Sequence, residues 1–491
     1  MSYTSYFYLL FFLGVLVALY YLIPLKKRWL VLLGGSYFFY WMASGKMIVF
    51  LLITTVSVYL GALAMEREQQ AFDSVRKSLE KEERKTRKAV MMRRKRHIVF
   101  AMVLINVGLL AFLKYYHFFS ANINALGSHL EPGFQLPALK LLMPLGISFY
   151  TLSAVGYVID VYRETTRAQK NYAKVLLYIS FFPQLIAGPI VKYHDVEAEI
   201  NNRKQTPEEI GKGIRRFIAG LSKKVLIANT MGLVADNLFG AAATGITGPG
   251  AWLGAVSYML QIYFDFSGYS DMALGLGMMF GFHFHENFDY PYISASIREF
   301  WRRWHMSLSG WFKEYLYIPL GGNRRGKFRT VVNKMIVFVC TGIWHGASFN
   351  FLFWGIYHGF FLMLEEYIPF IGKKGGKLKS FFQHVYALLV VCVGFVFFRA
   401  DTMKQGCFWI REMFTDFGWK ASAMSLTLQQ LTPVYLVTLA AALVAAVPVN
   451  SMLKKYKWYE GFTYVLSLAG FALCVLSLAG GTYNPFIYFR F

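Results

Sequence analysis

Long apolar runs recur along the whole chain and are separated by shorter polar stretches. A straight helix needs about 20 apolar residues to cross a bilayer, and several runs reach that length. They predict an all-α, polytopic integral membrane protein with roughly ten or more membrane segments in one domain over residues 1–491. The runs cover residues 5–24, 29–43, 47–64, 98–119, 141–159, 252–282, 331–364, 381–398, 431–449 and 462–478.

Lysine and arginine residues alternate between rich and poor loops. Lys26, Lys27 and Arg28 follow the first run, Lys46 stands alone after the second, and residues 66–97 after the third carry twelve Lys or Arg against six Asp or Glu. Cytoplasmic loops are enriched in basic residues, so the alternation predicts an extracytoplasmic N-terminus. The first run has no basic region before it, which predicts a span rather than a cleaved signal peptide.

The charged stretch 66–97 predicts a cytoplasmic helix outside the bilayer. Its mixed charges recur at helical spacing, as in Glu80 with Arg84 and Glu83 with Arg87. Such i,i+4 pairs stabilise a solvated helix. A lipid-sensing basic arm is the alternative, because anionic headgroups attract clustered basic residues.

Composition narrows the class of protein. Of 491 residues, 56% are hydrophobic and only 16% charged, whereas soluble chains carry roughly 25% charged residues. The net charge of +24 then belongs to loops facing an anionic leaflet rather than to a nucleic-acid-binding surface. The four cysteines share no CxxC spacing and predict neither a disulfide framework nor a metal site.

Residues 283–330 interrupt this apolar pattern with three histidines, three tryptophans and many charged side chains. Ionisable groups cost at least ~2.5 kcal/mol each at the bilayer centre, so the segment is predicted to be interfacial or re-entrant. A Trp and Arg belt that only anchors the protein at headgroup depth is the alternative. Helical spacing predicts an amphipathic helix with Trp301, Trp304, Leu308 and Trp311 on one face and Arg302, His305 and Ser309 on another.

Residues 335–364 are thirty mostly apolar positions that contain two histidines and no other acid or base. One straight helix of that length would measure about 45 Å, against a hydrocarbon core of about 30 Å. The segment therefore predicts a broken helix pair, with the break near Gly342, Gly346 and Asn350. Irregular backbone at membrane depth persists only where it is packed in protein or lines a cavity.

His345 lies beside this predicted break, between Trp344 and Gly346. An intramembrane histidine is a functional candidate, and the bulky indole and the glycine favour a pocket over a buried imidazole bonded to a carbonyl. On an unbroken helix His358 would point about 220° away from His345. It either approaches His345 through the turn or only braces the bundle.

Two blocks carry a family resemblance: REFWRRWHMSLSGWFKEYLYIPLGGNRRG at 298–326 and GIWHGASFNFLFWGIYHG at 342–359. Together they closely resemble the membrane-bound O-acyltransferases, the MBOAT proteins, and most of all the alginate O-acetyltransferase type. Further matching blocks lie at 144–163, 180–190, 263–282, 286–292, 396–401 and in the closing NPFIYFRF.

The resemblance implies a helical acyltransferase of the bacterial plasma membrane whose essential histidine is His345. It also implies modification of an exported or cell-wall polysaccharide such as alginate, with the acetyl group handed to a separate, hydrolase-like extracytoplasmic acetyltransferase. His305 lies in the family's second histidine-bearing block. Because the donor is cytoplasmic and the acceptor outside, a central channel with His345 near its waist is expected.

Acyl transfer from a thioester to a hydroxyl needs a base, and neutral histidine suits that task. His345 is the candidate general base, with oxyanion help expected from backbone N–H groups near Gly346 or from Asn350. Arg302 and Arg303 are expected beside His305 at a cytoplasmic entrance for an anionic donor such as acetyl-CoA. No bound cofactor is expected.

Three alternatives remain at this point. The family's D-alanylating branch, which modifies teichoic acids, shares the RWHMSLS block and the WHG histidine but usually lacks YIPLGGNRRG. A transporter also carries buried histidines and broken helices, although it predicts inverted repeats that are not visible here. A noncatalytic scaffold for polysaccharide export would tolerate loss of His345.

Overall fold

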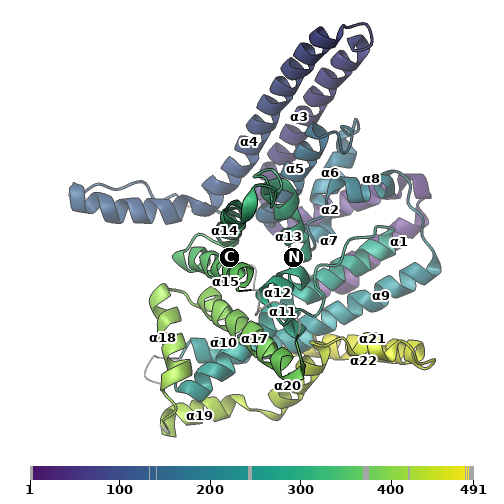
Figure 1. Cartoon of the computed structure of the whole chain (residues 1–491). Coiled ribbons are helices and arrows are strands. Elements are labelled where there is room, and N and C mark those ends of the chain that lie inside the picture. The colour runs from purple at the N-terminus through teal and green to yellow at the C-terminus, as the bar shows by residue number, and fades with distance from the viewer. Residues whose placement is uncertain are drawn as a thin grey trace. The chain divides into compact units, whose positions relative to one another are not determined.

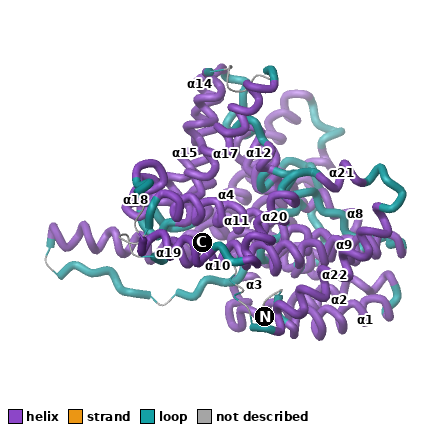
Figure 2. Tube along the Cα trace, turned by 90° about the horizontal axis from the view of Figure 1, so that it is seen from below, coloured by secondary structure: helices purple, strands orange, loops and turns teal. Residues whose placement is uncertain are grey.

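The computed structural model describes residues 4–131, 133–139, 141–241, 246–368, 375–418, 421–481, 483 and 485. Across these ranges the regular elements are helices, and no strand is present (Figure 2). Residues 369–374 and most of the closing NPFIYFRF lie outside the described residues. Residue contacts divide the chain into two compact units. The single domain over 1–491 stays a prediction.

The first unit comprises Met1–Pro207 with Phe280–Phe284. Its longest helices, α3 (Ile48–Val75) and α4 (Lys81–Leu130), form a long antiparallel hairpin (Figure 1). Gly61 allows close packing, because a Cβ atom there would lie 2.6 Å from Met102 Cγ. The other helices are α1 (Leu13–Leu22), α2 (Arg28–Ser44), α5 (Ile147–Tyr162), α6 (Tyr172–Ser180), α7 (Phe182–Leu185) and α8 (Tyr193–Asn201).

The charged stretch 66–97 is a helix–turn–helix and not the predicted single helix. α3 ends at Val75 and α4 begins at Lys81, so the charges occupy the end of the hairpin. The predicted Glu83–Arg87 pair is present at 3.1 Å. Glu80 instead precedes α4, where its carbonyl accepts the Arg84 N–H at 2.8 Å.

The second unit comprises Glu208–Met279 with His285–Phe491. It contains α9 (Pro207–Ser222), α10 (Asn229–Phe239), α11 (Gly248–Phe280), α12 (Ile297–Arg303), α13 (Met306–Phe312), α14 (Gly326–His345), α15 (Phe349–Tyr367), α17 (Lys377–Arg399), α18 (Met403–Thr415), α19 (Ala421–Gln430), α20 (Pro433–Ala445), α21 (Val449–Leu453) and α22 (Tyr459–Ala479).

Helix α11 is the central element of this unit. It crosses α9 at backbone contact, because a Cβ atom on Gly220 would lie 2.5 Å from the Gly268 carbonyl oxygen. Lys224, just beyond α9, pairs with Asp265 of α11 at 2.7 Å, with both side chains almost fully buried. Buried charges need such pairing to offset the loss of hydration.

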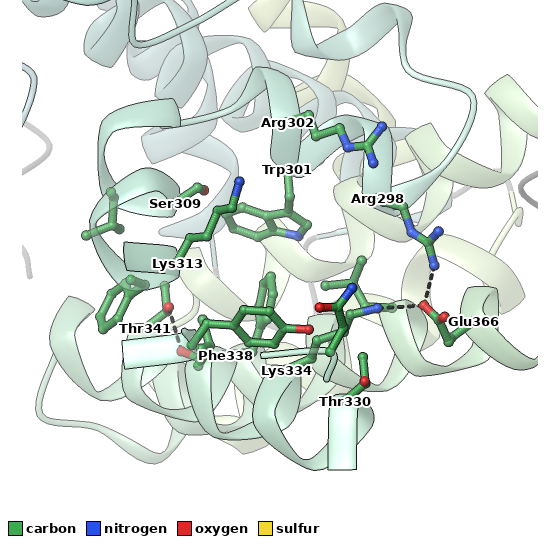
Figure 3. A pocket seen from close by; sticks show the side chains of 16 residues that line it. Arg298, Trp301, Arg302, Ser309, Lys313, Thr330, Lys334, Phe338, Thr341 and Glu366 are labelled. Atoms are coloured by element: carbon green, nitrogen blue, oxygen red, sulfur yellow. Dashed lines mark hydrogen bonds and ion pairs between the residues drawn. The ribbon is translucent and has the colours of Figure 1, made fainter. Parts of the chain in front are cut away.

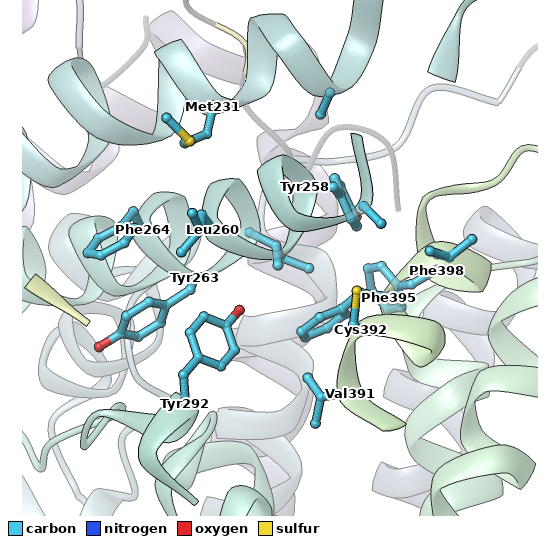
Figure 4. Packing of buried hydrophobic residues seen from close by; sticks show 14 of the residues in the cluster. Met231, Tyr258, Leu260, Tyr263, Phe264, Tyr292, Val391, Cys392, Phe395 and Phe398 are labelled. Atoms are coloured by element: carbon cyan, nitrogen blue, oxygen red, sulfur yellow. The ribbon is translucent and has the colours of Figure 1, made fainter. Parts of the chain in front are cut away.

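An aromatic core packs on α11. Tyr258, Tyr263 and Phe264 of this helix belong to one buried cluster with Phe395 and Phe398 of α17 (Figure 4). Aromatic side chains bury large apolar areas and prefer edge-to-face contacts. The core therefore fixes α17 against α11, and α17 supplies part of the site described below.

Five helical stretches of the described residues are long and apolar enough to cross a membrane, and a bent pair would make a sixth. Shorter apolar helices lie at Phe7–Leu22 and Ile147–Tyr162. The protein is therefore an all-α, multi-pass membrane protein, while the larger number of ten or more segments stays a prediction. The stretches are Leu25–Val75, Lys81–Leu130, Pro207–Phe239, Lys377–Arg399 and Tyr459–Ala479, and the pair is Met424–Gln430 with Pro433–Ala445.

Candidate active site

His345 is the last residue of α14, and Gly346–Ser348 separate it from α15. The helix therefore breaks in the predicted region. The two helices pack so closely that only glycine fits at two positions. A Cβ atom on Gly342 would lie 2.3 Å from the Phe351 carbonyl oxygen, and one on Gly346 would lie 2.2 Å from the Phe351 ring. This crossing holds the His345 backbone firmly.

Aromatic rings surround the His345 imidazole, whose residue is 7% exposed. Its ring centroid lies 5.1 Å from those of Trp354 and Phe398, in edge-to-face geometry, and 4.9 Å from that of Trp344. A cavity of about 10 Å³ opens beside it, roughly the space that one water-sized group requires. The lining residues are Ile262, Phe266, Trp304, His345, Trp354, Phe395 and Phe398.

His358 and His345 both contact the ring of Trp354. Its imidazole packs edge-to-face on Trp354 at 5.0 Å and on Trp301 at 5.2 Å. Residue 358 is 1% exposed, and neither ring nitrogen has a hydrogen-bond partner among the described residues. Both histidines thus contact Trp354, while only His345 lines the small cavity.

The segment around His305 is not the single amphipathic helix that the spacing predicted. α12 ends at Arg303 and α13 begins at Met306, because His305 adopts left-handed backbone angles of φ 45° and ψ 53°. The predicted apolar face is nevertheless buried. His305 does not share an exposed face with Arg302, since it is 1% exposed.

His305 is held inside the protein by Asn287. Its Nδ1 lies 3.2 Å from Asn287 Oδ1, which also accepts the Ser307 hydroxyl at 2.9 Å. Burial lowers the pKa of His305 to about 3, so the ring is neutral at physiological pH. The His305 ring lies 6.1 Å from that of Trp344. His305 therefore packs beside Trp344 and supports the aromatic residues around His345. Its partner Asn287 was not predicted from sequence, because no spacing rule relates residues 287 and 305.

Asn350, the expected oxyanion donor, uses its side-chain amide to bind backbone carbonyls, and its expected role stays a prediction. Its side-chain amide donates to the Ala400 carbonyl at 2.7 Å and to the Phe397 carbonyl at 3.3 Å. The amide therefore satisfies carbonyl groups at the end of α17. The Gly346 N–H makes a 3.4 Å bond to the Gly342 carbonyl.

A second, much larger cavity of about 440 Å³ is lined by α12, α13 and α14 with neighbouring residues (Figure 3). Its lining residues are Arg298, Trp301, Arg302, Leu308, Ser309, Phe312, Lys313, Tyr317, Asn323, Thr330, Lys334, Val337, Phe338, Thr341, Leu362 and Glu366. Four are cationic and one is anionic, so the pocket suits an anionic ligand.

Glu366 neutralises part of this charge. Arg298 and Lys334 each lie 2.6 Å from Glu366 Oε2 (Figure 3), and the hydrogen bond from Lys334 lowers the pKa of Glu366. Arg302 and Lys313 remain as the other cations of the pocket. Arg302 thus lines the basic pocket, and its donor-binding role stays a prediction.

Arg303 does not line this pocket. It pairs with Asp289 at 2.7 Å and with Glu299 at 3.1 Å, and its expected donor-binding role stays a prediction. Three further cations of the pocket were not predicted from sequence, namely Arg298, Lys313 and Lys334. Their positive charge is evident in the sequence, but no spacing rule predicts that these three separate segments line one pocket.

Two indole rings separate the large pocket from the small cavity. Trp301 lines the first, Trp354 lines the second, and their centroids lie 5.5 Å apart. Neither indole N–H has a hydrogen-bond partner among the described residues. Since buried polar groups are usually paired, these donors are suited to a ligand that enters from the pocket.

Comparison with known proteins places these features in context. Residues 163–374 match the membrane-bound O-acyltransferase family, MBOAT. A probable alginate O-acetylase, AlgI, of Pseudomonas putida is 39% identical, with 79% of this chain and 83% of that protein covered. A peptidoglycan O-acetyltransferase of Helicobacter pylori is 36% identical over 62% of each chain. A teichoic acid D-alanyltransferase of Bacillus subtilis is 28% identical over 55% of this chain and 72% of that protein.

Proposed function

The chain belongs to the membrane-bound O-acyltransferase family, and we propose on that premise that it moves an acetyl group from a cytoplasmic thioester towards an exported or cell-wall polysaccharide such as alginate. Acetyl-CoA is the expected donor. The observation that carries the proposal is the position of His345, which ends a broken helix and lines a small, mostly aromatic cavity.

His345 is proposed as the general base of this transfer. The acceptor hydroxyl oxygen attacks the thioester carbonyl carbon while His345 takes the hydroxyl proton. A C–O ester bond forms, the C–S bond breaks, and the proton passes from the imidazole to the leaving thiolate. The products are an acetyl ester and a free thiol, and the histidine returns to its neutral form.

The basic pocket supports an anionic thioester donor. Arg302 and Lys313 carry the charge that phosphate groups of acetyl-CoA would contact, since Glu366 balances part of the charge of Arg298 and Lys334. Guanidinium groups match phosphate geometry well. The thioester end would then pass the Trp301–Trp354 pair to reach His345.

Transfer across the membrane needs access from both faces. The basic loops support a cytoplasmic donor side and an extracytoplasmic N-terminus. We propose that the acetyl group leaves on the outer side to a separate extracytoplasmic acetyltransferase before it reaches the sugar. Acetyl transfer is favoured over D-alanyl transfer because identity to the alginate O-acetylase is 39%, against 28% to the D-alanyltransferase.

Thiol release by the purified full chain tests the proposal. In lipid nanodiscs with acetyl-CoA, an acceptor polysaccharide and the extracytoplasmic protein fraction of the same cells, which supplies the separate acetyltransferase, wild type is expected to release thiol and form acetyl ester together. His345→Ala is expected to lose about 10²- to 10⁴-fold in turnover, the usual contribution of a general base. His358→Ala should retain far more activity, because His358 does not line the small cavity. Equal activity of wild type and His345→Ala would refute the assignment.

A further inference from the structure

We propose that the aromatic cavity beside His345 restricts the transferred group to the size of acetyl. This inference rests on the proposed function and adds a specificity determinant to it. The relevant quantity is the volume, about 10 Å³, of the cavity lined by His345, Ile262 and five aromatic side chains.

The cavity volume matches a single methyl-sized group. A space of about 10–15 Å³ holds one water, and a methyl group has a similar size. When the thioester carbonyl lies against His345, the methyl group of acetyl can occupy this space. Each further methylene would have to displace a ring, and hydrophobic pockets discriminate one methylene by roughly 10- to 200-fold.

The lining rings cannot retreat easily, because each is backed by another ring. Phe398 contacts Trp354 at 5.1 Å and Phe351 at 4.9 Å. Trp304 packs between Phe395 at 5.2 Å and Phe300 at 5.4 Å. Protein interiors are packed to crystal-like density, so a wall of this kind holds its shape.

Ile262 and Phe398 offer two independent ways to enlarge the cavity. Ile262 comes from α11 and Phe398 from α17, and both line the cavity. Phe397 is an adjacent control that is also buried, packs on Phe353 at 4.5 Å and does not line the cavity.

The experiment compares acetyl-, propionyl- and butyryl-CoA as donors for the full chain in nanodiscs, with the same polysaccharide and extracytoplasmic protein fraction as above, and measures thiol release and ester formation for each. Wild type is expected to prefer acetyl over propionyl by at least about tenfold. Phe398→Leu and Ile262→Ala are expected to reduce this preference about tenfold and to raise propionyl turnover in absolute terms. Phe397→Leu should keep the wild-type preference.

Either of two results would overturn the proposal. Equal turnover of butyryl-CoA and acetyl-CoA by wild type would show that this cavity does not limit the size of the transferred group. Cavity variants that remain active with the wild-type preference show that the limit lies elsewhere. If both fail to fold, Ile262→Phe, which fills the cavity, is expected to lose acetyl transfer at normal abundance, and full acetyl transfer would refute the proposal. Failure of the proposed function is distinct: wild type would then transfer no acyl group from any donor.

Discussion

The two cavities of the second unit differ in almost every physical property. The pocket of about 440 Å³ is lined by four cations and a carboxylate, whereas the cavity of about 10 Å³ at His345 is lined by aromatic rings and an isoleucine. The first has room and charge for an anionic ligand, whereas the second has room for only about one water-sized group, so electrostatic interactions there are expected to be stronger. Under the proposed function, donor binding and the chemical step therefore belong to two neighbouring but separate spaces.

One helix pair joins both spaces, and disturbing it is expected to have the largest effect. A Cβ atom on Gly355 would lie 2.4 Å from the Phe338 carbonyl oxygen. Gly355→Ala should therefore push α15 from α14, displacing Trp354 and His345 together, and abolish turnover with a clear loss of thermal stability. Gly310→Ala is the control, because nothing lies within 4 Å of a Cβ atom there. A fully active Gly355→Ala protein would show that the crossing does not fix the site.

Removing a pocket cation should impair donor binding and leave the chemical step intact. Arg302→Ala or Lys313→Ala is expected to raise the KM for acetyl-CoA about tenfold to a hundredfold, the usual worth of a hydrogen bond to a charged group. Steady-state kinetics should show little change in kcat. Arg303→Ala should leave KM unchanged, because Arg303 pairs with Asp289 and Glu299. Equal KM changes in the Arg302 and Arg303 variants would contradict this separation.

Acid is expected to lower the stability of the folded protein through protonation of His305. Burial lowers its pKa to about 3, while an unfolded histidine has a pKa near 6.5. The stability from keeping His305 neutral is complete above pH 6.5 and is lost progressively as pH falls towards 3. Between pH 6.5 and 5 the loss is about 2 kcal/mol.

Unfolding of the purified protein in detergent at pH 7.5 and 5 measures this loss. His305→Asn is expected to unfold with a weaker dependence on pH than wild type. The same dependence in both proteins would show that His305 titrates at an ordinary pKa.

The smallest expected change concerns the carboxylate of the pocket. Glu366→Gln removes the negative charge that Arg298 and Lys334 share, so both cations become available to an anionic donor. The KM for acetyl-CoA is expected to fall by a few fold, with a steeper dependence on salt. A rise in KM would instead mean that Glu366 orients the two cations for binding.

Sequence was informative where one local rule decided the structure. Thirty apolar residues exceed the bilayer thickness, and glycines mark where such a helix breaks, so the break beside His345 could be predicted. At Trp304 and His305 no glycine or proline signals the break. There, burial of His305 and its contact with Asn287 override the helical spacing.

Other site features depend on tertiary contacts that no spacing reveals. Asn350 has the right chemistry and position for an oxyanion donor, but the end of α17 uses its amide. Lys313, just after α13, and Lys334 of α14 are separated by 21 positions and line one pocket only because of the fold. Residue type could be read from the chain, whereas the choice of partner required the fold.

The most direct test of the central claim is polysaccharide O-acetyl content in cells that carry His345→Ala, beside wild type and His358→Ala, with membrane abundance checked in each. The account predicts that O-acetyl is lost in His345→Ala at normal abundance and largely retained in His358→Ala. Unchanged O-acetyl content in His345→Ala would contradict the role of His345 as the general base and favour a transporter or scaffold.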